Sequence, residues 1–278
     1  MTDPLAKPAE TEGALRDILD TVLEPVRTGA RQVSVEDVRV GVFYTAVKLS
    51  TGHAGMAYCP TEDLPLDHMQ RHSYMPRAGR LHTLGVEELA GLALSDNILE
   101  ASAGLAAINA LAELSFDRGW PGARVVADAD ALDLLGVRPE DTVTLVGAFP
   151  FFIRRLQGKV ARLYVTERNP QAYSGYPLTP AERQEEALSA SDVVVITAAA
   201  LGNHTLDGIL ALCGRARSIA LVGPTTPLCP GPLFERGVTV VGGTHVVDGD
   251  ALLHAVGEGG TGGQVWSGGA VKVNLLRG

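Results

Sequence analysis

The sequence contains little cysteine, few aromatic residues and no excess of positive charge, and each shortage excludes a class of protein. Its 278 residues include three cysteines, too few and too far apart for a disulfide framework, so a reducing, cytoplasmic location is predicted. The formal net charge of -9 and the absence of a basic stripe argue against a nucleic-acid or anionic-membrane partner. No run of about 18 apolar residues is present to predict a membrane span.

The common catalytic and nucleotide-binding motifs are missing as well. The chain has no P-loop, no GxSxG elbow, no kinase motif and no CxxC pair. It also lacks the glycine-rich fingerprint of an ordinary dinucleotide site. Function therefore has to be inferred from the order of strands, loops and polar residues.

The overall composition predicts a globular protein with a core of small aliphatic side chains. Apolar residues make up 46% of the chain, charged residues 20% and aromatic residues 5%. A chain of this length holds one large or two ordinary domains. The sequence Gly119-Trp120-Pro121-Gly122 interrupts regular structure, so we predict an N-terminal domain over residues 12–118 and a C-terminal domain over residues 119–278.

The first part of the chain reads as an α+β domain. Apolar residues recur at helical spacing in residues 13–26, and a β-branched, aromatic segment at 38–49 predicts one strand. A turn at Thr51-Gly52 leads to a returning strand at 55–59. Two helices are expected at 86–93 and 98–114.

The second part alternates strands and helices. The strands are expected at 143–146, 163–166, 193–197, 219–222 and 238–241, and the helices at 151–156, 180–190, 205–213 and 232–236. A glycine-rich stretch at 259–269 is expected to form a loop before a last strand at 270–275. Because the strands are almost wholly apolar, they are typical of a parallel sheet covered on both faces. The fold class is therefore α/β, with a Rossmann-like parallel sheet after the N-terminal α+β domain.

The most informative pair of residues is Gly147 and Glu167. Gly147 follows one predicted strand, and Glu167 follows the next strand 20 residues later. In doubly wound α/β domains this spacing places a tight turn over part of a nucleotide-like ligand and an acid near its ribose hydroxyls. The alternative is an ordinary strand-to-helix turn beside a solvated glutamate.

Two further loops follow predicted strands and would lie at the same edge of the sheet. After the strand at 193–197, Asn203 can cap the next helix, and His204 stands beside it as a possible ligand or base. After the strand at 219–222, prolines stiffen a loop that contains Pro224 and Thr225, whose hydroxyl and backbone N–H groups suit a polar group. Ordinary connections with a cap and a stiff turn are the alternatives.

The helix at 98–114 carries polar residues in an apolar sequence. Asn97 can cap its first turn, and Ser102 and Asn109 share one face because they are seven residues apart. A buried asparagine must find hydrogen-bond partners. Asn109 therefore contacts either a strand end or a ligand between the domains.

Five segments together resemble a known family. They are ASAGLAAINAL (101–111), LVGAFP (145–150), VTERNP (165–170), SDVVVITAAALGNHTLDGIL (191–210) and LVGPTTPLCPGPLFERGV (221–238). In this order they resemble the heavy-metal chelation family, a Rossmann-like domain of unknown function with its N-terminal partner domain. The resemblance extends from about residue 15 to about residue 257. It implies an enolase-N-terminal-like domain, a Rossmann-like domain and a ligand cleft between them.

The resemblance also implies a set of site residues. Glu167 is the candidate acid–base or polar-edge residue, and Phe149 and Pro150 would cover a flat ligand face. The implied cleft residues are Asn97, Ser102, Asn109, Gly147, Phe149, Glu167, Asn203 and Pro224, and their loops add Pro150 and Thr225 as candidate binding residues. The expected function is binding of a small molecule, or an enzymatic step, linked to heavy-metal chelation or chelator biosynthesis. The ligand would be nucleoside-like, pterin-like or a metal chelate, and a homodimer is possible.

Two alternatives remain open at the level of sequence. The first is direct binding of a metal chelate without catalysis, with His204 and His245 as the candidate metal ligands. The second is an S-adenosylmethionine-using transferase, which the strand–loop–acid order suggests and the single glycine argues against.

Overall fold

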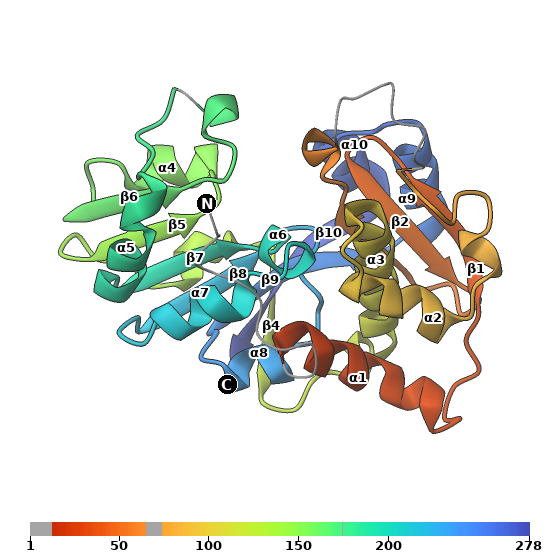
Figure 1. Ribbon diagram of the computed structural model, residues 1–278. Coiled ribbons are helices and arrows are strands. Elements are labelled where there is room, and N and C mark those ends of the chain that lie inside the picture. The colour runs from red at the N-terminus through yellow and green to blue at the C-terminus, as the bar shows by residue number, and fades with distance from the viewer. Residues whose placement is uncertain (1–12, 65–73, 174) are drawn as a thin grey trace.

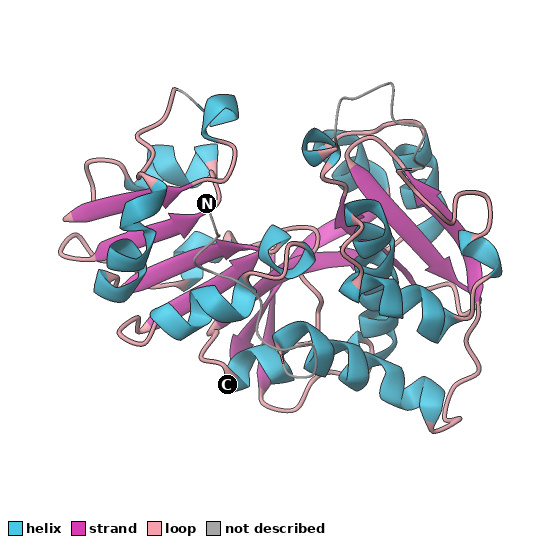
Figure 2. Ribbon diagram, in the orientation of Figure 1, coloured by secondary structure: helices cyan, strands magenta, loops and turns pink. Residues whose placement is uncertain are grey.

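The structure, a computed structural model, describes residues 13–64, 74–173 and 175–278. It has two lobes, each built on its own sheet (Figure 1). The C-terminal lobe holds a seven-stranded sheet, and the N-terminal lobe holds a three-stranded sheet. Figure 2 shows helices on both sides of the larger sheet.

The larger sheet confirms the predicted α/β class. Its strands are β4 (Ala123–Ala127), β5 (Thr142–Val146), β6 (Arg162–Thr166), β7 (Val193–Thr197), β8 (Ser218–Val222), β9 (Val240–Val246) and β10 (Ala270–Arg277). Their spatial order is β4-β10-β9-β8-β7-β5-β6, and β5 to β9 are parallel. Counted from β5, the parallel strands have the order 2-1-3-4-5, the second common order of doubly wound sheets.

Helices cover both faces of this sheet because successive side chains of a strand point to opposite faces. Val193 and Val195 pack with α4 (Pro150–Leu156). Val194 and Ile196 face the other side, where the covering helices are α5 (Gln184–Ala190), α7 (Leu206–Leu212) and α8 (Gly231–Glu235). The short helix α6 (Ala199–Gly202) follows β7 directly.

The N-terminal sheet consists of β1 (Val35–Val40), β2 (Tyr44–Leu49) and β3 (Ala54–Tyr58), all antiparallel. The prediction of one strand over 38–49 was wrong, because the chain reverses after Gly41. The Gly41 N–H donates to the Tyr44 carbonyl at 2.9 Å, which closes a hairpin. Its turn residues, Val42 and Phe43, are exposed and apolar, so they hid the turn in the sequence.

Three helices precede the larger sheet: α1 (Ala14–Arg27), α2 (Val86–Gly91) and α3 (Ile98–Phe116). Helix α3 packs on β2 and β3, and every residue of its central part, from Leu99 to Leu114, is buried. Helix α3 is also the one described helix that is long and apolar enough to cross a membrane, and 89% of its most apolar window is buried inside the protein. This burial is the property of a core helix.

The glycine-rich stretch near the C-terminus is not the loop that was expected. It contains α10 (Gly262–Gly268), and a helix that sequence reasoning did not assign, α9 (Gly249–Gly257), precedes it. Asp248 caps α9 by accepting from Asp250 N–H, and Thr261 and Gln264 form a capping box on α10. Sequence reasoning also missed β4, which pairs only with β10 in the described structure.

The two lobes are interwoven by the C-terminal part of the chain. Leu252 and Val256 of α9 pack against Ala46 and Met56, so α9 covers the face of the small sheet opposite α3. Strands β9 and β10 run from the larger sheet toward the N-terminal lobe (Figure 1). The division near residue 119 stays a prediction, and the packing adds that residues 249–268 complete the N-terminal lobe.

An ion pair with a buried carboxylate connects the segments that precede β5 and β8. Arg217 donates from Nη1 and Nη2 to the two carboxylate oxygens of Asp141, at 2.8 and 2.6 Å. Asp141 is 3% exposed. The hydrogen bond from Arg217 lowers the pKa of Asp141 below its ordinary value.

We expect Asp141→Asn to lower the free energy of unfolding by about 2 kcal/mol at neutral pH. Because the folded-state pKa of Asp141 is lowered, its stabilisation is present above the unfolded pKa of about 3.9 and is lost as the pH falls through the folded value. Urea denaturation at neutral and acidic pH measures the difference in the free energy of unfolding between the parent protein and the variant. This difference should become smaller in acid. Glu140→Gln, an exposed neighbour, is the control. A difference of equal size at both pH values would contradict the assignment.

Candidate functional site

The order in which the chain adds parallel strands to the sheet reverses between β5 and β7. From β5 the chain passes to β6 on one side, and it then crosses to β7 on the other side. Ligands of doubly wound sheets bind outside the carboxyl ends of the strands at this point. The residues that follow these strands are Gly147 after β5, Glu167 after β6 and Ala198 after β7.

Gly147 occupies a position that excludes side chains. Its φ is +97°, a region that favours glycine, and an added Cβ would lie 2.9 Å from Thr197 Cγ2. Its N–H donates to the Thr166 carbonyl at 2.8 Å, which continues the ladder with β6. The ends of β5, β6 and β7 therefore meet at this residue.

Glu167 is held in place by two backbone N–H groups. Its Oε2 accepts from Ala148 N–H at 2.8 Å, and its Oε1 accepts from Asn169 N–H at 2.9 Å. A carboxylate has further lone pairs, so these bonds orient the group and leave it able to accept from a ligand. Residues 147 and 167, which the sequence analysis paired by spacing, are thus joined through Ala148.

The loop after Gly147 enters α4 through Phe149 and Pro150. Pro150 stands in the first turn of the helix, where its missing N–H costs nothing. The Phe149 ring stacks on Phe152, with the ring centroids 5.3 Å apart. Phe149 is half-buried, so one aromatic surface borders this end of the sheet.

The loop after β8 joins the two lobes. The Pro224 carbonyl accepts from Asn109 Nδ2 at 3.2 Å, and the same nitrogen donates to the Met56 carbonyl at 2.6 Å. Thr225 Oγ1 accepts from Tyr58 N–H at 2.9 Å. Asn109 therefore contacts both a strand and a strand-end loop.

Two buried oxygens beside these contacts have no hydrogen-bond partner among the described residues. They are Asn109 Oδ1 and Thr226 Oγ1. Asn109 is 7% exposed and Thr226 is 1% exposed. A buried acceptor needs a donor from water or a ligand.

Two other predicted residues have structural partners. The Ser102 hydroxyl lies 2.8 Å from Thr45 Oγ1 and 2.9 Å from the Tyr58 carbonyl oxygen. Asn97 caps α3 by accepting from Leu99 N–H, and it donates to the Tyr74 carbonyl. Both side chains position α3.

Asn203 and His204 lie in the turn between α6 and α7. Asn203 Oδ1 accepts from the Thr205 hydroxyl at 2.7 Å, which fixes the turn. His204 has a φ of +59°, and its Nε2 lies 3.4 Å from the Ser95 carbonyl oxygen, next to the start of α3.

The structure does not bring the two predicted metal ligands together. His245 Nδ1 lies 2.7 Å from Glu113 Oε2, and this hydrogen bond raises the pKa of His245. Glu113 lies near the end of α3, whereas His204 lies near its beginning, so about 25 Å of helix separates them. In residues 13–64, 74–173 and 175–278, no group of three or more His, Cys, Asp or Glu side chains is arranged to hold a metal ion.

The cysteines are also unsuited to bind metal as they stand. All three are free and buried. Burial raises the pKa of Cys59, and it raises the pKa of Cys213 and of Cys229 to about 12. Because their pKa values are raised, these thiols stay protonated at neutral pH, whereas metal ligation requires thiolates.

Sequence reasoning missed three residues that interact with one another or with Glu167: Tyr58, Glu62 and Tyr173. The Tyr58 hydroxyl donates to Glu62 Oε1 at 2.8 Å, and burial and this bond raise the pKa of Tyr58. The pKa of Tyr173 is also raised, chiefly by burial and to a smaller extent by the charges of Glu167 and Glu62. Groups from the two lobes therefore lie within electrostatic reach of each other. The one available signal was tyrosine in a chain poor in aromatic residues.

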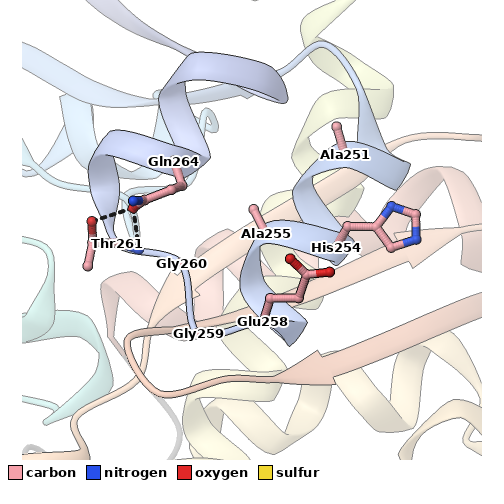
Figure 3. A pocket seen from close by; sticks show the side chains of 8 residues that line it. All are labelled: Ala251, His254, Ala255, Glu258, Gly259, Gly260, Thr261 and Gln264. Carbon is pink, nitrogen blue, oxygen red and sulfur yellow. Dashed lines mark hydrogen bonds between the residues drawn. The ribbon is translucent and has the colours of Figure 1, made fainter.

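We call Tyr58, Glu62, Gly147, Glu167 and Tyr173 the strand-end site. A separate surface pocket of about 510 Å³ lies between α9 and α10 (Figure 3). It is lined by Ala251, His254, Ala255, Glu258, Gly259, Gly260, Thr261 and Gln264. None of the residues predicted from the sequence lines this pocket.

These features define a two-lobed α/β protein in which the carboxyl ends of a mostly parallel sheet face a small antiparallel sheet. The chain belongs to the family described as "Putative heavy-metal chelation", whose family model matches residues 130–275. A second family model with the same description matches residues 24–112. The resemblance stated from the sequence motifs is thereby confirmed.

Solved structures of this family share the fold. One is a protein of unknown function from Pyrococcus horikoshii, 24% identical, with a TM-score of 0.77 over 95% of this chain and 100% of that chain. Another is a protein of unknown function from Desulfitobacterium hafniense DCB-2, 25% identical, with a TM-score of 0.73 over 94% of this chain and 98% of that chain.

A curated relative is an uncharacterised protein of Methanocaldococcus jannaschii. It is 29% identical over 172 residues. The match spans 60% of this chain and 63% of the relative. The match thus covers less than two thirds of the relative's length.

We expect alanine to lower the free energy of unfolding by different amounts at two glycines with positive φ, Gly147 and Gly158. Gly158→Ala should cost about 1 kcal/mol, because the φ of Gly158 is +71° and its Cβ would meet open space. Gly147→Ala should cost about 3 kcal/mol, since backbone strain and the contact with Thr197 add together. Urea denaturation of both variants measures the difference. Equal costs would contradict the close approach at Gly147.

Proposed function

We propose that this protein binds a small organic molecule at the strand-end site, as part of heavy-metal chelation or chelator biosynthesis in the cytoplasm. The observation that carries the proposal is the carboxyl end of the sheet, where two backbone N–H groups orient Glu167 beside Gly147 and where the charges of Glu167 and of Glu62 from the other lobe both help to raise the pKa of Tyr173. Ordinary packing does not need two carboxylates within electrostatic reach of one phenol at the carboxyl end of a sheet. Doubly wound sheets bind their ligands at this place, which supports the same conclusion.

The chemistry of these groups favours a ligand rich in hydrogen-bond donors. Glu62 and Glu167 accept hydrogen bonds, and the unpartnered oxygens of Asn109 and Thr226 lie by the adjoining loop. A ligand with amine, amide or hydroxyl donors, or one that carries a bound cation, complements such a set. Nucleoside-like and pterin-like molecules and cationic metal chelates meet this requirement.

Aromatic side chains add a preference for flat ligands. Tyr58 packs edge-on against Tyr44, with centroids 6.5 Å apart, and Tyr44 packs against Trp266 in the same way. In the C-terminal lobe, Phe149 lies at the end of β5 and stacks on Phe152. Rings of this kind contact planar ligands over a large area at little entropic cost.

Within this proposal, the residues of the chain have distinct tasks. Glu167, oriented by Ala148 and Asn169 N–H groups, binds the polar edge of the ligand and is the group placed to exchange a proton with it. Gly147 lets the ligand approach the backbone at the end of β5. Asn109 and Thr225 hold the facing lobe at a fixed distance.

The family description also permits direct binding of a metal, which the donor set of this chain does not favour. The buried thiols are protonated, and His204 and His245 lie at opposite ends of α3. A transferase that uses S-adenosylmethionine remains a second candidate, because Glu167 follows the strand next to Gly147.

Calorimetric titration separates these candidates. Adenosine, pterin, S-adenosylmethionine, Cu²⁺, Ni²⁺, Zn²⁺ and Fe³⁺ are each titrated into the purified protein. We expect an organic probe to bind, and we expect Glu167→Gln and Tyr173→Phe to weaken that binding at least tenfold each, about 1.4 kcal/mol. The reason is that each variant removes a polar contact and keeps the side-chain shape.

His254→Ala, in the pocket between α9 and α10, is the matched control and should bind as the parent protein does. Binding of an organic probe that neither site variant alters would refute the assignment of the site. A free metal ion that binds tightly while every organic probe fails would favour direct metal binding instead.

A further inference from the structure

Strand β1 forms the open edge of the N-terminal sheet. The strand order is β1-β2-β3, so among the described strands β1 has a hydrogen-bonded neighbour on one side only. It lies at the outer margin of the molecule in Figure 1. An unpaired edge of this kind is a template for pairing with another chain.

The register shows which backbone groups point outward. Gly41 N–H donates to the Tyr44 carbonyl, and Arg39 is paired with Ala46, so the odd-numbered residues of this stretch face β2. Hydrogen-bonding pairs alternate along antiparallel strands. The N–H and C=O groups of Val38 and Val40 therefore point away from the sheet.

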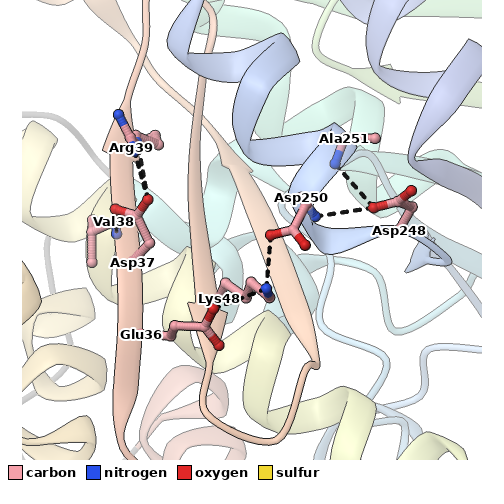
Figure 4. Close-up of polar contacts among 8 residues, drawn as sticks. All are labelled: Glu36, Asp37, Val38, Arg39, Lys48, Asp248, Asp250 and Ala251. Atoms are coloured by element: carbon pink, nitrogen blue, oxygen red, sulfur yellow. Dashed lines mark hydrogen bonds and ion pairs between the residues drawn. The ribbon is translucent and has the colours of Figure 1, made fainter.

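One of these outward groups is occupied by a side chain. The register shifts between Val35 and Asp37, and there Asp37 Oδ1 accepts from Val38 N–H at 2.7 Å. Arg39 in turn donates from Nε and Nη2 to Asp37 Oδ2, at 2.9 and 2.7 Å (Figure 4). The carboxylate thus blocks the edge, and the guanidinium holds it in that position.

Apart from Asp37 and Arg39, the β1 edge is suited to pairing with another strand. Val40 is 40% exposed, and the adjoining turn exposes Val42 and Phe43 at 54% and 41%. An antiparallel pair centred on Val38 would join the Val38 N–H and C=O groups to the same groups of a second copy. Such a twofold arrangement is self-complementary.

We propose that Asp37 and Arg39 together keep the β1 edge closed to strand addition by a second copy of this chain. Asp37 removes the central donor that an incoming strand needs, and the charged pair adds a desolvation cost to any approach. Irregular register and charge at an edge are common protections of this type.

The first test is the association state of a variant that lacks the block. In Asp37→Thr/Arg39→Thr, the edge keeps residues that favour strands and loses both charges. Sedimentation velocity across a wide concentration range should show an apparent mass that rises toward twice that of one chain. Hydrogen exchange should show new protection of the Val38 and Val40 N–H groups at high concentration.

The matched control removes an exposed ion pair of similar length elsewhere. Arg27 and Asp20 of α1 lie 2.8 Å apart, so Asp20→Ala/Arg27→Ala loses the same two charges away from the edge. The control should sediment as the parent protein does. A double variant of β1 that sediments like the parent at every concentration would overturn the proposal.

A second measurement does not depend on how the double variant folds. In the parent protein, Val38 N–H should exchange more slowly than Val40 N–H, because only the former has an acceptor among the described residues. Asp37→Asn keeps an acceptor oxygen and should preserve this difference, whereas Asp37→Thr should remove it. Equal exchange of the two N–H groups in the parent protein would contradict the block.

Discussion

The close packing of helix α3 is the constraint on which the rest of the structure depends. Gly104 brings the helix so near to the preceding segment that a Cβ would lie 1.9 Å from Ala93 N. Gly55 brings β3 equally near, with a Cβ 2.1 Å from Ala110 N. Neither contact can relax by moving a flexible side chain, because both neighbours are backbone atoms. Gly104 therefore sets the distance between α3 and the segment that holds Ala93, and Gly55 of β3 sets the distance between α3 and the N-terminal sheet.

The same helix sets the relation between the lobes. Three of its polar side chains, Ser102, Asn109 and Glu113, are buried and contact segments far away in the sequence. Asn109 contacts the loop after β8, and Glu113 contacts the long strand β9. A buried polar contact is costly to leave unmade, so these bonds specify one arrangement. The strand-end site depends on this arrangement, because Tyr58 is fixed by Ser102 and Thr225.

The predictable parts of this fold were those with a local pattern. Apolar runs such as 193–197 identified the parallel strands, and the spacing of Gly147 and Glu167 indicated two neighbouring strand ends that Ala148 connects. The turn after Gly41 was hidden because its residues are apolar, and α9 and α10 were hidden because glycine dominates their ends. Tyr173 could not be found from the sequence, since one of the two charges that help to raise its pKa, that of Glu62, comes from the other lobe.

The most direct test of the account is native mass spectrometry of the protein as purified, beside its denatured mass and a metal analysis of the same sample. The account predicts a bound organic molecule that is released on denaturation and is lost from a Glu167→Gln/Tyr173→Phe protein that remains folded. Retention of the same molecule by that variant would contradict the strand-end site. A bound metal ion with no organic mass would contradict the proposed ligand class.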